Sequence, residues 1–116
     1  MQDHTDLKRL KNAYILKCKE LETASLKYPD LGEDMASKER DYRVQKGIVT
    51  LQLKEDGMQA TLIPTIVNGK VADQRFDFKV AESMFHSCRE NIKRLHANLD
   101  AYRSLLSVAK SEMEIR

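Results

Sequence analysis

The histidines and cysteines are the residues of this sequence that could bind a metal ion. His86 and Cys88 are the closest pair, two positions apart in a predicted helix. Side chains at positions i and i+2 of a helix point to different faces, so these two cannot bind one ion together without distortion. His4 and His96 have no neighbouring ligand residues, and zinc sites need about four ligands. The sequence therefore predicts no metal site and no cofactor.

Two histidines could act as general bases because each has a carboxylate four residues further along the chain. His86 is followed by Glu90, and His96 is followed by Asp100. Such a carboxylate can orient an imidazole for proton transfer. No nucleophile or glycine-rich pocket loop accompanies either pair, and on exposed helices such pairs are usually weak surface ion pairs. We therefore expect a protein that is not an enzyme.

Two groups of basic residues could contact a nucleic acid. If the fold brought them onto one face, they could follow a phosphate backbone. Acidic residues are interspersed among them, so a solvated helix surface is the alternative interpretation. The candidate nucleic-acid contacts are Lys38, Arg40, Arg43, Lys46, Arg89, Lys93 and Arg94.

Composition restricts the class of protein. The chain has 116 residues and a net charge of +2, with 6% aromatic residues, which disfavours a dedicated nucleic-acid binder. We expect one domain over 1–116. No apolar run is long enough to span a membrane, and no secretory signal follows Met1, so we expect a cytoplasmic protein. In that compartment Cys18 and Cys88 should be reduced, buried thiols.

The elements that would position these residues begin with two predicted helices, which make up a helical N-terminal region over residues 1–46. The first should cover 6–27, with apolar or aromatic residues at a 3-4 spacing that only Lys17 interrupts. Pro29 should end it, because the residue before a proline avoids helical angles. A second helix is predicted over 33–45, with Gly47 in the left-handed position that follows a helix.

A change of period at Ile48 predicts a β-meander over 47–78. Apolar and polar residues alternate from 48 to 54, and 55–57 is typical of a hairpin turn. A second strand is predicted over 58–67. Asn68-Gly69 favours another tight turn, and a third strand should follow over 70–78. The expected sheet has three antiparallel strands.

The last predicted helix, within 79–116, has the most regular pattern in the sequence. Apolar residues alternate at intervals of four and three from Ala81 onward, which is typical of a coiled-coil seam. Besides Ala81 and Ala109, the predicted packing seam comprises Phe85, Cys88, Ile92, Leu95, Leu99, Tyr102, Leu106 and Met113.

The expected fold is therefore α+β, with two N-terminal helices, a three-stranded meander and a long C-terminal helix. The first helix, 6–27, would span roughly 33 Å, whereas 80–113 would span roughly 51 Å. The short helix could cover the remaining length of the seam. Alternatively, a second copy of the chain could cover it, and we expect a homo-oligomer.

Two stretches resemble small early-region proteins of phages and prophages of Gram-positive bacteria. One is Lys38–Gly47, KERDYRVQKG, and the other is His96–Leu106, HANLDAYRSLL. The resemblance spans much of the chain but includes no diagnostic motif, and it carries no site residues across. It implies an accessory role in phage DNA metabolism or in binding a host protein.

The most direct interpretation is a non-enzymatic interaction or scaffolding protein that acts through helix packing and has an unidentified protein partner. The alternative is a nucleic-acid-binding accessory factor. Interleaved acids and few aromatic residues predict that any nucleic-acid binding would be weak.

Overall fold

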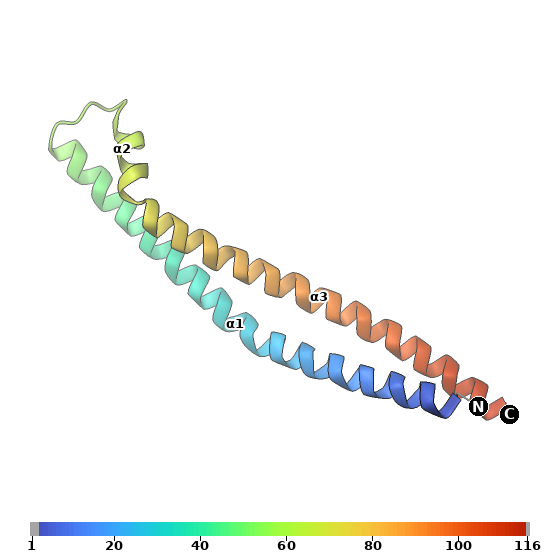
Figure 1. Cartoon of the computed structure of the whole chain (residues 1–116). Helices are drawn as coiled ribbons and strands as arrows, with labels where there is room; N and C mark the ends of the chain where they lie inside the picture. The colour runs from blue at the N-terminus through green and yellow to red at the C-terminus, as the bar shows by residue number, and fades with distance from the viewer. Residues whose placement is uncertain (1–2, 116) are drawn as a thin grey trace. The chain divides into compact units, whose positions relative to one another are not determined.

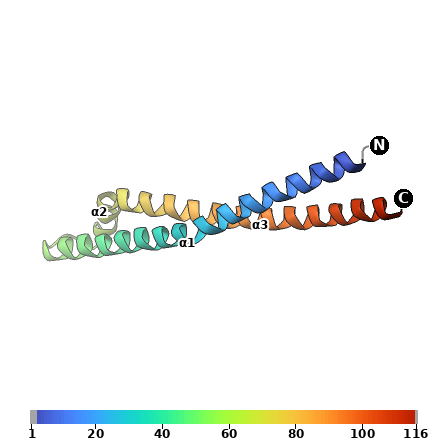
Figure 2. The same cartoon turned by 90° about the horizontal axis from the view of Figure 1, so that it is seen from below.

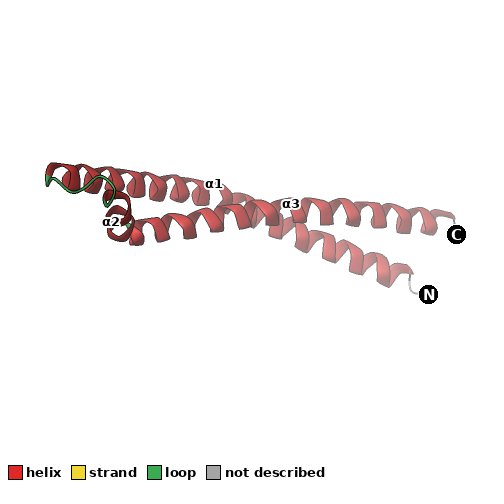
Figure 3. Cartoon of the chain, turned by 90° about the horizontal axis from the view of Figure 1, so that it is seen from above, coloured by secondary structure: helices red, strands yellow, loops and turns green. Residues whose placement is uncertain are grey.

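We analysed the chain as a computed structural model that describes residues 3–115. It contains three helices, α1 (Asp3–Glu55), α2 (Ile63–Lys70) and α3 (Ala72–Ile115) (Figure 1). No strand occurs among the described residues, which are helical except for short connections (Figure 3). The predicted α+β fold with a three-stranded meander is therefore wrong, and the described chain is all-α.

Helix α1 continues through Pro29, where the sequence analysis ended the first helix. A proline inside a helix removes one backbone hydrogen bond and costs about 3 kcal/mol. However, the 3-4 spacing of inward residues continues beyond it without a break, and burying a large apolar side chain contributes about 1.5–3 kcal/mol. Packing along one face thus outweighs the proline, and no separate helix over 33–45 exists. The α1 seam comprises Leu7, Leu10, Tyr14, Lys17, Leu21, Ala24, Tyr28, Leu31, Met35, Lys38, Tyr42, Gln45 and Val49, all buried or half-buried.

The segment predicted as the first strand, 48–54, is the last stretch of α1. Val49 and Leu53 are buried and four residues apart, which is a helical spacing. The Thr50 hydroxyl donates a hydrogen bond to the Lys46 carbonyl at 2.7 Å, as threonines do inside helices. Gly47 consequently lies inside α1 instead of following a helix. The alternation over seven residues was a coincidence of composition.

The true C-terminal glycine of α1 is Gly57, which has a φ of +76°. Its N–H donates to the Lys54 carbonyl at 3.1 Å, and the Met58 N–H donates to the Leu53 carbonyl at 3.0 Å. These two bonds form a Schellman motif, which satisfies the last carbonyls of a helix. The chain therefore turns at 55–57, as a turn was predicted there, but the turn ends a helix.

The predicted second and third strands are replaced by a connection, by α2 and by the start of α3. Pro64 lies in the first turn of α2, where its missing N–H costs nothing. Asn68 and Gly69, predicted as a hairpin turn, lie in the last turn of α2. Helix α3 begins at Ala72, eight residues before the predicted start at Val80. The ten predicted seam residues of α3 are all buried or half-buried. This α3 seam also includes Gln74 and Phe78, which continue its spacing toward the N-terminus.

Contacts divide the chain into two compact units. Unit 1 comprises Met1–Tyr28 and Ser87–Arg116, and unit 2 comprises Pro29–His86. Each unit combines a stretch of α1 with a stretch of α3, and unit 2 also contains α2. The expectation of a single domain over 1–116 stays a prediction.

Unit 1 has a narrow core between its two helices. Ala24, Leu95 and Leu99 are buried, and the last two are 1% and 2% exposed. Tyr14 on α1 lies beside Arg103 on α3, and Ala24 lies beside Cys88. Residue numbers rise on one helix as they fall on the other, so the two stretches are antiparallel.

Unit 2 has a larger core where α2 packs against α1 (Figure 2). The centres of the Tyr42 and Phe78 rings lie 6.1 Å apart, and Gly32 lies against the Phe85 ring. The stretches of α1 and α3 in this unit are therefore antiparallel as well. A Cβ atom added at Gly32 would be only 3.0 Å from Phe85 Cε1, so the absence of a side chain permits this approach. The buried cluster comprises Val49, Leu53, Ile63, Val67 and Val71.

Candidate protein-interaction surface

The structure does not gather the histidines and cysteines into a site. Among the side chains described, at residues 6–114, no three of His, Cys, Asp or Glu are placed to hold a metal ion. The side chain of His4 lies outside the described ones. His86 is exposed, and its ring contacts the edge of the neighbouring Phe85 ring. His96 is exposed as well, and the described contacts include no ion pair between it and Asp100.

The two cysteines are free and half-buried. The Cys88 thiol donates a hydrogen bond of 3.4 Å to the Ala24 carbonyl of α1. This hydrogen bond therefore joins α3 to α1 within unit 1.

The seven candidate nucleic-acid contacts fall into different units. Four lie on α1 in unit 2, and Arg89, Lys93 and Arg94 lie on α3 in unit 1. Most are already paired with a neighbouring acid: Arg43 with Glu39 at 2.9 Å, for example. Lys38, Arg40, Arg89 and Lys93 have similar partners at 3.5–4.0 Å. Neutralising neighbours weaken attraction to phosphate, so nucleic-acid binding stays a prediction.

Unit 1 also holds a polar contact between its helices. The Tyr14 hydroxyl accepts a hydrogen bond from Arg103 Nε at 3.2 Å. This bond and the nearby Asp100 raise the pKa of the Arg103 guanidinium, which is charged at neutral pH in any case. Near it, a cleft of about 400 Å³ is lined by Leu7, Lys11, Leu106, Lys110, Met113 and Glu114.

In unit 2 the basic, acidic and apolar side chains are distributed unevenly around the helix pair. The position of each residue relative to the seams explains this distribution. A helix turns about 100° per residue, so the residue before a seam position lies to one side and the residue after it lies to the other. In antiparallel helices, the "before" positions of both helices fall on the same side of the pair. The "after" positions of both share the opposite side.

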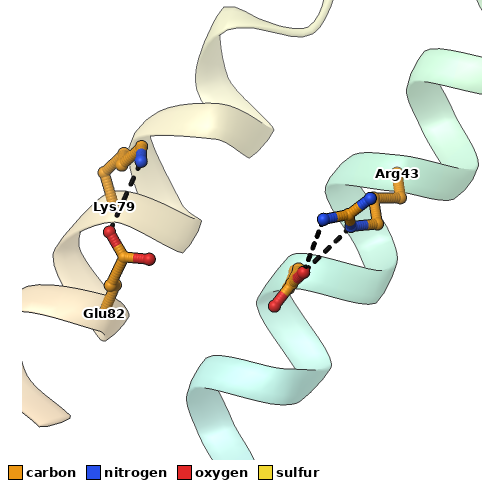
Figure 4. A network of polar contacts seen from close by, with 4 residues as sticks. Arg43, Lys79 and Glu82 are labelled. Carbon is orange, nitrogen blue, oxygen red and sulfur yellow. Dashed lines mark hydrogen bonds and ion pairs between the residues drawn. The ribbon is translucent and has the colours of Figure 1, made fainter.

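The side formed by the "after" positions is predominantly basic. Arg43 and Lys79 are each joined to a glutamate of their own helix, at 2.9 Å and 3.4 Å (Figure 4). Lys46 Nζ lies 5.7 Å from the centre of the Tyr42 ring, and Lys79 Nζ lies 5.3 Å from the centre of the Phe78 ring. These cation–π contacts hold the basic groups over the helix pair. The basic side comprises Arg43, Lys46, Arg75 and Lys79, with Glu39 and Glu82.

The side formed by the "before" positions combines exposed apolar residues with aspartates. Val44 and Ile48 on α1, and Val80 and Met84 on α3, directly precede seam residues. Leu51 continues the α1 stripe. Phe76 instead lines a cleft together with Arg75 and Lys79 of the basic side. The five apolar side chains are 41–59% exposed. The apolar–acidic side comprises Val44, Ile48, Leu51, Val80 and Met84, with the exposed Asp34, Asp41, Asp73 and Asp77.

The apolar side chains of this surface form a sizeable patch. Each exposes on the order of 100 Å², so the five together present roughly 500 Å², which is within the range of about 300–600 Å² for the largest, often functional, patch on a monomer. A standard interface buries roughly 800 Å² per partner, with an apolar centre and a polar rim. The apolar–acidic side has both components.

Several of these residues were missed because 48–54 and 70–78 were assigned to strands. Ile48 and Leu51 on α1, and Asp73 and Asp77 on α3, then appeared to belong to a sheet. A signal was nevertheless present, since an apolar residue or an aspartate repeatedly precedes a seam position in both helices. Reading it requires the α1 seam to be followed through Pro29.

Comparison with known proteins adds no family to this picture. Protein-family models, curated proteins and solved structures gave no match to the chain. Among the described residues, no helix has the length and apolar character needed to cross a bilayer. The resemblance to phage early-region proteins therefore stays a prediction.

Proposed function

We propose that this protein is a helical interaction module whose apolar–acidic side in unit 2 binds a helix of a partner. The observation that carries the proposal is the segregation of side chains on the two sides of unit 2. Exposed apolar residues and aspartates lie on one side, whereas basic residues with glutamate partners lie on the other. A surface shaped only by solubility would not need this separation.

The apolar stripes suit a helical ligand in particular. Val44, Ile48 and Leu51 have an i, i+4, i+7 spacing, and Val80 and Met84 have an i, i+4 spacing. Two such ridges on neighbouring antiparallel helices accept the ridges of another helix between them. Packing of this kind extends a two-helix contact into a bundle.

The aspartates of this side add a preference for a basic partner. Asp73 and Asp77 have no ion pair within residues 3–115, and the ion pairs of Asp34 and Asp41 are long, at 4.0 Å and 3.7 Å. Carboxylates at the rim of an apolar patch accelerate the approach of a cationic surface and disfavour anionic ones.

An accessory, scaffolding role in the cytoplasm fits this chemistry and the resemblance to phage early-region proteins. We propose that the protein holds other chains together and does not transform a substrate.

Site-specific photo-crosslinking tests the proposal. A photoreactive phenylalanine analogue at position 80 should yield covalent adducts in the cells that make the protein, because a bound helix would lie against Val80. The same analogue at position 43, on the basic side, is the matched control and should yield few. Equal labelling at both positions, or none at position 80, would contradict the proposed surface.

A further inference from the structure

Unit 1 carries an exposed stripe on the outer face of α1, opposite the α1 seam. Ile15 and Leu26 are 50% and 70% exposed, and Leu26 is the most exposed of the large apolar side chains in the described chain. Lys8 and Lys19 precede and follow Ile15 on the same face, seven and four residues away. The exposed Glu22 shares this face, three residues after Lys19. The outer stripe of α1 comprises Lys8, Ile15, Lys19, Glu22 and Leu26.

With two lysines and one glutamate, this stripe is an amphipathic surface with a net positive charge, which is the chemistry that the apolar–acidic side of unit 2 would recognise. Both lysines are exposed, and among the described residues neither makes an ion pair. From Lys8 to Leu26 the stripe spans roughly 27 Å, and from Asp34 to Leu51 the apolar–acidic side spans roughly 26 Å along α1. Charge, apolar content and length therefore match.

The charge of the two units supports the same pairing. The sequence of unit 1 has 12 Lys and Arg residues against 8 Asp and Glu, whereas unit 2 has 8 against 10. Unit 1 is thus net positive and unit 2 net negative. Opposite charges of this kind steer two copies toward each other and oppose contact between two unit 2 surfaces.

We propose that the partner on the apolar–acidic side is a second copy of this chain, which contributes the outer stripe of its α1. This inference rests on the proposed function and names the partner. The stripe and the side that receives it are different surfaces, so every copy of the chain carries both halves of the contact.

A charge-swap experiment on the full chain tests this contact by sedimentation equilibrium. The first variant carries Asp41→Lys and Asp77→Lys, and the second carries Lys8→Glu and Lys19→Glu. Each should associate at least about tenfold more weakly than the wild type, because like charges then face each other. An equimolar mixture of the two variants should recover association, since the swapped charges are again complementary.

The control variant carries Lys93→Glu and Lys110→Glu, which repeats the charge change of the second variant at exposed positions outside the proposed contact. It should associate like the wild type, and circular dichroism should show that all variants are folded. A wild-type monomer at every concentration, a mixture that stays dissociated, or a control that dissociates equally would overturn the inference. If the wild type is monomeric while position 80 still crosslinks to a different protein, the proposed function stands and the self-association fails.

Discussion

Leu95 and Leu99 show most simply how single residues hold unit 1 together. They are the most buried large side chains of that unit, and they are separated by one turn of α3. In a two-helix contact few atoms surround each core residue, so each removed methyl group leaves contacts unmade. Their burial follows from the spacing of the α3 seam, which the sequence alone predicts.

Truncating either leucine should therefore be costly. Leu95→Ala and Leu99→Ala should each lower the free energy of unfolding by about 2–5 kcal/mol, because a cavity remains at a fully buried position. Chemical denaturation monitored by circular dichroism measures this change. Leu105→Ala is the matched control. Its side chain is 52% exposed on the same helix, so the loss should stay below about 1 kcal/mol. Equal losses at all three positions would contradict the burial pattern.

At the scale of elements, two glycines show where the observed fold differs from the expected one. The sequence placed Gly47 after a helix, in a left-handed conformation, whereas the structure places it inside α1. Nothing lies within 4 Å of a Cβ atom added at Gly47. Gly57 instead has the positive φ and ends α1.

Gly47→Ala and Gly57→Ala should consequently have opposite effects. Alanine at position 47 should stabilise the protein by about 0.5–1 kcal/mol, because it restricts the unfolded chain and fits a helix. Alanine at position 57 should destabilise it by about 1 kcal/mol or more, because a Cβ atom disfavours the left-handed conformation. Thermal and urea unfolding of both variants measure these changes. A destabilising Gly47→Ala would indicate that α1 does not continue through this position.

The elements also show why local sequence rules failed here. Pro29 and the alternation over 48–54 are strong local signals of a helix end and of a strand. Neither signal depends on which residues are covered by a helix that is distant in the sequence. The 3-4 spacing from Leu7 to Val49 does mark the covered face, because every residue at this spacing is buried or half-buried. Over such a length, a continuous period outweighs a proline and seven alternating residues. The α3 seam was predictable for the same reason, since nothing local competes with it.

For the whole molecule, the sequence disclosed the total charge but not its distribution. A net charge of +2 suggests no particular partner, yet it combines a positive unit 1 and a negative unit 2. Within unit 2, the segregation depends on which residues flank the two seams, and this requires the antiparallel pairing of α1 and α3. The basic residues chosen from the sequence are divided between units and are mostly paired with acids. Of the residues of the basic side, Arg75 was assigned to a strand, and Lys79 to the start of the last helical region, 79–116.

The central claim is that the apolar–acidic side of unit 2 is covered by a partner, and Met84 provides the most direct measurement. Its side chain is 53% exposed, whereas Met35 and Met58 are half-buried on the inner faces of the fold. Brief hydroxyl-radical oxidation, read by mass spectrometry, reports the exposure of each methionine. It can be applied to the dilute purified chain and inside the cells that make it.

The account predicts rapid oxidation of Met84 in the dilute chain and at least severalfold protection in the cell. Met35 and Met58 should change little relative to it, because the fold already covers them, and they correct for differences in radical dose. Equal oxidation of Met84 in both samples, after that correction, would show that nothing covers this side of unit 2 and would contradict the account.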